Sequence, residues 1–170
     1  MKKIFLGALC LLLCLGVSAK APVKIACVGN SITYGYTIEN RERDSYPAQL
    51  QRMLGEGYTV GNFGKSGATL LNKGHRPYMK QEEFQKALAF AGDIVVIHLG
   101  INDTDPRNWP DYRDFFVRDY LALIDSFRVV NPDVRILVAR MTRVLSPVRV
   151  TGMERYNKPL RPLQDTPMYS

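Results

Sequence analysis

The stretch DIVVIHL, residues 93–99, decides the fold. It is a short run of almost entirely apolar residues, rich in β-branched side chains, which is typical of a strand buried on both faces. A strand of this kind belongs in the interior of a parallel sheet whose faces are covered by helices. The sequence on either side of it is therefore expected to alternate between strands and helices.

Three more strands and three helices are predicted around this stretch. The strands are VKIACV (23–28), YTVGNF (58–63) and VRILVA (134–139). The helices span about 44–54, where Pro47 fits a first helical turn, 81–90 and 111–130. Their predicted buried stripes are Leu50, Met53 and Leu54; Phe84, Ala87 and Leu88; and Phe116, Tyr120, Leu123, Ile124 and Phe127.

The resulting order, β-α-β-α-β-α-β, predicts a parallel sheet with right-handed crossovers. This is a three-layer α/β/α, flavodoxin-like arrangement. No helix follows the strand at 134–139, so the fold is expected to lack a last strand and helix. That strand is then an exposed edge, which predicts poor solubility.

The first 19 residues are predicted to be a secretory signal peptide. Lys2 and Lys3 precede an apolar run over 4–17, and Val17-Ser18-Ala19 is a small-residue cleavage site. A membrane anchor is the alternative, but the run is shorter than the ~20 residues that a spanning helix needs. Lipidation at Cys14 is disfavoured because the preceding residue, Leu13, is large. An exported protein, periplasmic or extracellular, without stable membrane insertion after cleavage is expected.

The last residues, 143–170, form a predicted irregular tail, so the expected domain spans 20–142. The tail holds four of the ten prolines and shows no helical or strand period. Two hypotheses account for it. It is either a natural disordered tail or the product of a chain cut short or translated in the wrong frame from about Arg143.

Charge and cysteine content exclude several classes of protein. The net charge is +7, but the basic residues are spread along the chain and no nucleic-acid-binding motif accompanies them. Cys27 is the one cysteine that follows the signal peptide, and it lies in an apolar run. It is predicted to be a buried small hydrophobe rather than a reactive thiol. The first strand is not followed by a nucleotide-binding glycine motif.

Polar clusters follow three of the predicted strands at 29–31, 62–69 and 100–103. Ligands of parallel sheets bind at the carboxyl ends of the strands, so the three clusters are expected to meet there. Ser31 after a buried strand suits a nucleophile, and the Gly64 N–H and the Asn102 amide suit oxyanion donors. Each cluster alone is better explained as a helix cap or a turn.

Taken together, the motifs GNSIT (29–33), NFGKSGAT (62–69) and GIND (100–103) resemble the SGNH/GDSL hydrolase family. The resemblance runs from about Val23 to Met141. The segments NFGKSGATLLNKGHRPY and HLGINDTDPRNWP further resemble the branch of bacterial sialate O-acetylesterases. The resemblance implies a serine esterase that removes O-acetyl groups from a carbohydrate such as sialic acid, with no metal or organic cofactor.

The same resemblance implies roles for residues at matched positions. Ser31 is the expected nucleophile, and the N–H groups of Ser31 and Gly64 with the Asn102 side chain form the expected oxyanion hole. The candidate substrate-binding residues are Asn30, His75, Arg76 and Trp109, where surface charge or core packing are the alternatives.

The family's Asp-x-x-His block, which supplies the base, is absent. The chain contains only His75 and His98, and neither stands in that context. A serine hydroxyl is a poor nucleophile without a base, so a catalytically inactive fragment or carbohydrate-binding module of the same fold is the alternative function. The oligomeric state is left open by the sequence.

Overall fold

The computed structural model of the protein describes residues 21–141. The predicted signal peptide (1–19) and the predicted irregular tail (143–170) lie outside the described residues. No helix within 21–141 has the length and apolar character needed to cross a bilayer.

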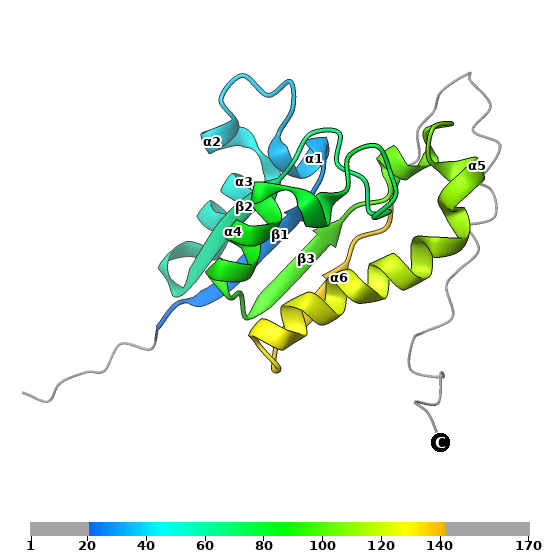
Figure 1. The fold of residues 1–170 in the computed structure, drawn as a ribbon. Coiled ribbons are helices and arrows are strands. Elements are labelled where there is room, and N and C mark those ends of the chain that lie inside the picture. The colour runs from blue at the N-terminus through cyan, green and yellow to red at the C-terminus, as the bar shows by residue number, and fades with distance from the viewer. Residues whose placement is uncertain (1–20, 142–170) are drawn as a thin grey trace, which may run out of the picture.

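Four parallel strands form one sheet in the order β2-β1-β3-β4 (Figure 1). The strands are β1 (Val23–Gly29), β2 (Tyr58–Gly64), β3 (Ile94–His98) and β4 (Arg135–Val138). The register pairs Gly29 with both Gly64 and His98, so the carboxyl ends of β1, β2 and β3 are level. The predicted parallel sheet is confirmed, and the three polar clusters follow the same edge of it.

Six helices connect the strands. They are α1 (Ser31–Tyr34), α2 (Arg41–Asp44), α3 (Tyr46–Leu54), α4 (Glu82–Phe90), α5 (Trp109–Tyr112) and α6 (Phe116–Val130). Single 3₁₀ turns lie at Gly55–Gly57, Tyr78–Lys80, Ile101–Thr104 and Arg113–Phe115. The α/β fold class predicted from the sequence is therefore confirmed.

Helices cover both faces of the sheet at β1. Successive strand residues point to opposite faces, and every residue from Ile25 to Gly29 is buried. On one face the core includes Phe84 of α4 and Phe127 of α6, whose rings meet edge to face at 6.1 Å. Figure 1 shows α6 running along the sheet on this side. On the other face lies Cys27, and burial raises the pKa of its thiol to about 11. Cys27 is thus a buried hydrophobe, as predicted.

The two edge strands end the sheet in different ways. Outside β2, the Gln51 side chain of α3 accepts a hydrogen bond from the Val60 N–H (2.7 Å) and donates one to the Tyr58 carbonyl (3.0 Å). Outside β4, no strand pairs within residues 21–141. Leu137 and Val138 of β4 are 49% and 47% exposed. The expectation of an exposed edge strand at 134–139 is met, and poor solubility stays a prediction.

Two details of the predicted helices are wrong. Met53 is 83% exposed rather than part of a buried stripe, because α3 turns Pro47, its buried residue, inward instead. The helix predicted over 111–130 is interrupted by the 3₁₀ turn Arg113–Phe115, so Asp111 belongs to the separate helix α5. The short helices α1 and α2 were not predicted, since four residues are too few for an apolar period.

Candidate active site at the carboxyl edge of the sheet

Ser31 opens α1 directly after β1. Gly29 ends the strand, and the buried Asn30 caps the helix by accepting a hydrogen bond from the Ile32 N–H at 3.1 Å. A Cβ at Gly29 would collide with the Thr33 side chain. Glycine at this point therefore lets the helix turn back tightly onto the end of the strand.

The Ser31 hydroxyl has no hydrogen-bond partner among residues 21–141, and Ser31 is partly exposed. Its main-chain carbonyl accepts from the N–H groups of Gly35 (3.0 Å) and Tyr36 (2.9 Å), which fixes the residue at the helix start. The first N–H groups of a helix have no partner inside the helix. Ser31 therefore presents a free hydroxyl next to an unpaired main-chain donor.

Gly64 lies beside α1, at the end of β2. A Cβ at Gly64 would collide with the Tyr34 main chain, so only glycine allows this approach. The Gly64 N–H donates to Asn62 Oδ1 at 3.0 Å. This predicted oxyanion donor is thus paired within the protein, and it would have to leave Asn62 to meet a ligand.

Asn102 lies in the 3₁₀ turn after β3, which Gly100 enters with a φ of 115°. The Asn102 side-chain amide donates one hydrogen bond to the Ala68 carbonyl at 2.8 Å. An amide group carries two hydrogens, so one is left for a ligand. The structure places Ser31, Gly64 and Asn102 at one edge of the sheet, and their catalytic roles stay predictions.

The loop after β2 is held by two buried aspartates that the sequence did not single out for this role. Asp103 accepts from the Leu70 N–H (2.9 Å) and the Leu71 N–H (2.7 Å). Asp119 of α6 accepts from the Asn72 N–H at 2.8 Å. Burial raises the pKa of Asp103 to about 6, although these main-chain donors oppose the shift.

Asn108 is a third residue that the sequence did not reveal. It is fully buried, and its side chain joins the loop at His75 to the main chain of Asn102. Asparagine is common in turns, so nothing in the local pattern marks such a position.

The candidate substrate-binding residues lie around this loop. Arg76 is exposed, and its guanidinium donates to the Ser66 carbonyl at 2.9 Å. Trp109 is partly buried and packs edge to face on Phe116 with ring centroids 5.7 Å apart. This packing supports its core-anchor alternative. Contact of Asn30, His75, Arg76 or Trp109 with a sugar stays a prediction.

The two histidines lie in different settings. His98 ends β3, and partial burial lowers the pKa of its imidazole. His75 is exposed, and its ring Nδ1 lies 3.0 Å from Asn108 Nδ2. Within the described part of the chain, neither histidine is hydrogen-bonded to Ser31. Among residues 21–141, the Ser31 hydroxyl is therefore not hydrogen-bonded to a base.

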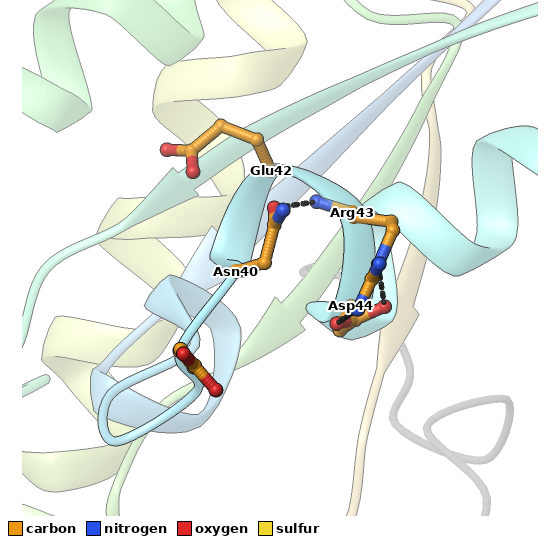
Figure 2. A pocket seen from close by; sticks show the side chains of 5 residues that line it. Asn40, Glu42, Arg43 and Asp44 are labelled. Atoms are coloured by element: carbon orange, nitrogen blue, oxygen red, sulfur yellow. Dashed lines mark hydrogen bonds and ion pairs between the residues drawn. The ribbon is translucent and has the colours of Figure 1, made fainter.

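A surface pocket lies at the segment 39–44 (Figure 2). It is lined by Glu39, Asn40, Glu42, Arg43 and Asp44, and none of the predicted site residues takes part. The Arg43 guanidinium pairs with the Asp44 carboxylate at 2.8 Å. In residues 21–141 no group of three or more His, Cys, Asp or Glu side chains could hold a metal ion.

A sequence model described as the GDSL-like Lipase/Acylhydrolase family matches residues 27–166. An acetylxylan esterase of Xylanibacter ruminicola is 50% identical over 106 residues, which are 62% of this chain and 22% of that protein. The chain thus spans about a fifth of the length of this relative.

Two solved structures share the fold. A family two carbohydrate esterase from Clostridium thermocellum, in complex with cellohexaose, superposes with a TM-score of 0.60 at 24% identity. That match covers 82% of this chain and 50% of the other. AlinE4, an SGNH-hydrolase family esterase, gives 0.52 at 20% identity, covering 74% and 63%. At these identities the likeness concerns the fold alone.

Proposed function

Because the chain belongs to the GDSL-like lipase/acylhydrolase family, we propose that it is an esterase that removes acetyl groups from a glycan, with Ser31 as nucleophile. The observation that carries the proposal is the free, partly exposed Ser31 hydroxyl at the carboxyl edge of the sheet. The acetylxylan esterase relative supports a carbohydrate substrate. Xylan is therefore the first glycan to test, and an O-acetylated sialic acid is the second.

In the proposed reaction, Ser31 Oγ attacks the acetyl carbonyl and its proton passes to a solvent water molecule, because no side-chain base in residues 21–141 is hydrogen-bonded to Ser31. The negative charge that develops on the carbonyl oxygen is met by the Ser31 N–H and by the second amide hydrogen of Asn102. The bond to the sugar oxygen then breaks, the sugar leaves with a proton, and water hydrolyses the acetyl-serine. The Gly64 N–H contributes once its bond to Asn62 opens.

The test is acetate release from p-nitrophenyl acetate and from acetylated xylan. Ser31→Ala is expected to lower turnover by more than about 1,000-fold, because no other group replaces the attacking oxygen. Ser126→Ala is the matched control, since the Ser126 hydroxyl only donates to the Ala122 carbonyl of its own helix. Turnover that survives Ser31→Ala would remove Ser31 from the proposal.

A second candidate function is a carbohydrate-binding module that does not hydrolyse its ligand. It is favoured by the two histidines, neither of which contacts Ser31 in the described residues. Calorimetric titration with acetylated xylan separates the two functions. Binding without acetate release supports the module, and turnover that depends on Ser31 excludes it.

A further inference from the structure

Asn108 stands at the N-cap position of α5 but does not cap it. Asparagine at this position ordinarily accepts from an N–H of the first helical turn, and the Asn108 side chain makes no such bond. Its amide is fully buried and directed elsewhere. The Asn108 side chain is instead held by hydrogen bonds to residues outside α5.

These hydrogen bonds reach two other segments, the distant loop at His75 and the nearby turn at Asn102. Asn108 Oδ1 accepts from the His75 N–H at 2.9 Å, in the loop after β2. Asn108 Nδ2 donates to the Asn102 main-chain carbonyl at 3.0 Å and lies 3.0 Å from His75 Nδ1. One side chain therefore ties the loop after β2 to the residue that carries the candidate oxyanion amide.

Asn102 is fixed from three sides by these contacts. Its carbonyl accepts from Asn108 Nδ2 and, at 3.3 Å, from the Asp105 N–H. The neighbouring Asp103 is bonded to Leu70 and Leu71, and the Asn102 amide meets the Ala68 carbonyl. Rotation of the Asn102 main chain would swing the side-chain amide away from the carbonyl carbon that Ser31 attacks. Donors are effective only when they are aimed in advance at the position of the developing charge.

We infer that Asn108 is a positioning residue for the Asn102 oxyanion donor. This inference rests on the proposed function, because it assigns Asn102 to the oxyanion hole. Asn108 does not touch the substrate, and it acts by holding the Asn102 carbonyl and the His75 loop in one arrangement. Its loss is expected to affect the chemical step rather than substrate binding.

Kinetics of the full chain on p-nitrophenyl acetate test the inference. Asn108→Ala is expected to lower kcat by about 10- to 100-fold with KM unchanged, as for a catalytic group displaced by about 1 Å. Asn108→Asp keeps the acceptor for the His75 N–H but loses the donor to Asn102, and the same fall in kcat is expected. In an Asn102→Ala background, Asn108→Ala is expected to lower kcat no further.

Asp119→Asn is the matched control. Asp119 is also buried and also tethers the loop, through the Asn72 N–H, but it does not touch Asn102 or Asn108. The substitution removes the ion pair of Asp119 with Arg118 (2.9 Å), so it is expected to lower the melting temperature while leaving kcat unchanged. An equal fall in kcat for Asp119→Asn at matched stability, or additive losses in the Asn102→Ala background, would overturn the inference.

A second measurement does not depend on turnover. The Asn102 side-chain amide signals in a ¹⁵N NMR spectrum are assigned by their loss in Asn102→Ala, and their hydrogen exchange reports the bond to the Ala68 carbonyl. Asn108→Ala is expected to speed this exchange, and Asp119→Asn to leave it unchanged. If the wild-type chain hydrolyses no ester, the proposed function fails, but unchanged exchange in Asn108→Ala still overturns the positioning role by itself.

Discussion

Two regions of the molecule hold carboxylates under opposite conditions. In the segment 39–44, Glu42 is paired with the adjacent Arg41 on the surface. Asp44 is paired with the adjacent Arg43 (Figure 2). At the loop after β2, Asp103 and Asp119 are buried and accept main-chain N–H groups of residues 70–72. Both regions contain short hydrogen bonds to carboxylates, yet we expect very different consequences when each carboxylate is removed.

The difference lies in what the partner does after the carboxylate is lost. An arginine at the surface returns to water, so an exposed pair contributes little to stability. A main-chain N–H in the interior cannot form a replacement hydrogen bond with water. Leaving it unpaired therefore carries the full cost of its desolvation. The comparison therefore teaches that burial of the donor, rather than the shortness of the bond, sets the effect.

The largest expected effect is that of Asp103→Ala. The substitution leaves the buried N–H groups of Leu70 and Leu71 without partners, and we expect a loss of about 3 kcal/mol in the free energy of unfolding at pH 7. Urea denaturation followed by circular dichroism measures it. A loss below about 1 kcal/mol would contradict the comparison, because a surface pair gives as much.

The next effect is the pH dependence that Asp103 confers. Its pKa is raised by burial from 3.8 to about 6, so the folded chain holds this proton more tightly than the unfolded chain does. The resulting stabilisation is fully present below pH 3.8 and is lost as the pH rises through about 6. A shift of this size corresponds to a fall of about 2–3 kcal/mol in the stability of the wild type relative to Asp103→Asn.

Unfolding free energies of the two chains between pH 4 and pH 7 measure this fall. Asparagine does not titrate in that range, so every other ionisable group cancels in the difference. Parallel curves for the two chains would show that Asp103 has its ordinary pKa in the folded state.

The smallest effect is expected for Asp44→Asn. Hydrogen bonds from Arg43 lower the pKa of this carboxyl, but the pair is exposed to water. We expect a melting temperature unchanged within the error of calorimetry, and no dependence of the difference on salt. A destabilisation comparable to that of Asp103→Ala would show that bond geometry outweighs burial.

The apolar pattern of the sequence located the sheet well. The predicted strand at 23–28 corresponds to β1 and the one at 58–63 to β2, each within one residue at its end. Strands buried by helices need uninterrupted apolar runs, and such runs are visible in one sequence. Met53 was misplaced because helical spacing indicates which residues share a face but not where the sheet ends.

The contacts that hold the candidate site could not be predicted in the same way. Asn108 meets His75 across 33 positions of sequence, and Asp103 meets Leu70 across the same separation. Such bonds have no period and depend on how two loops come to lie together. The motifs of Ser31, Gly64 and Asn102 each follow a strand, and the shared carboxyl edge of the sheet explains why these residues come together.

The Gln51 amide occupies two of the main-chain positions on the outside of β2 that an incoming strand would use, the Val60 N–H and the Tyr58 carbonyl. Growth of the sheet on this side, whether by an added peptide, an exchanged segment or a stack of copies, would first have to displace that side chain. On the other side, β4 has no partner strand within residues 21–141. In the described part of the chain, an added strand is therefore expected to pair more readily with Arg135–Val138, where a single lysine facing solvent would serve as a gatekeeper.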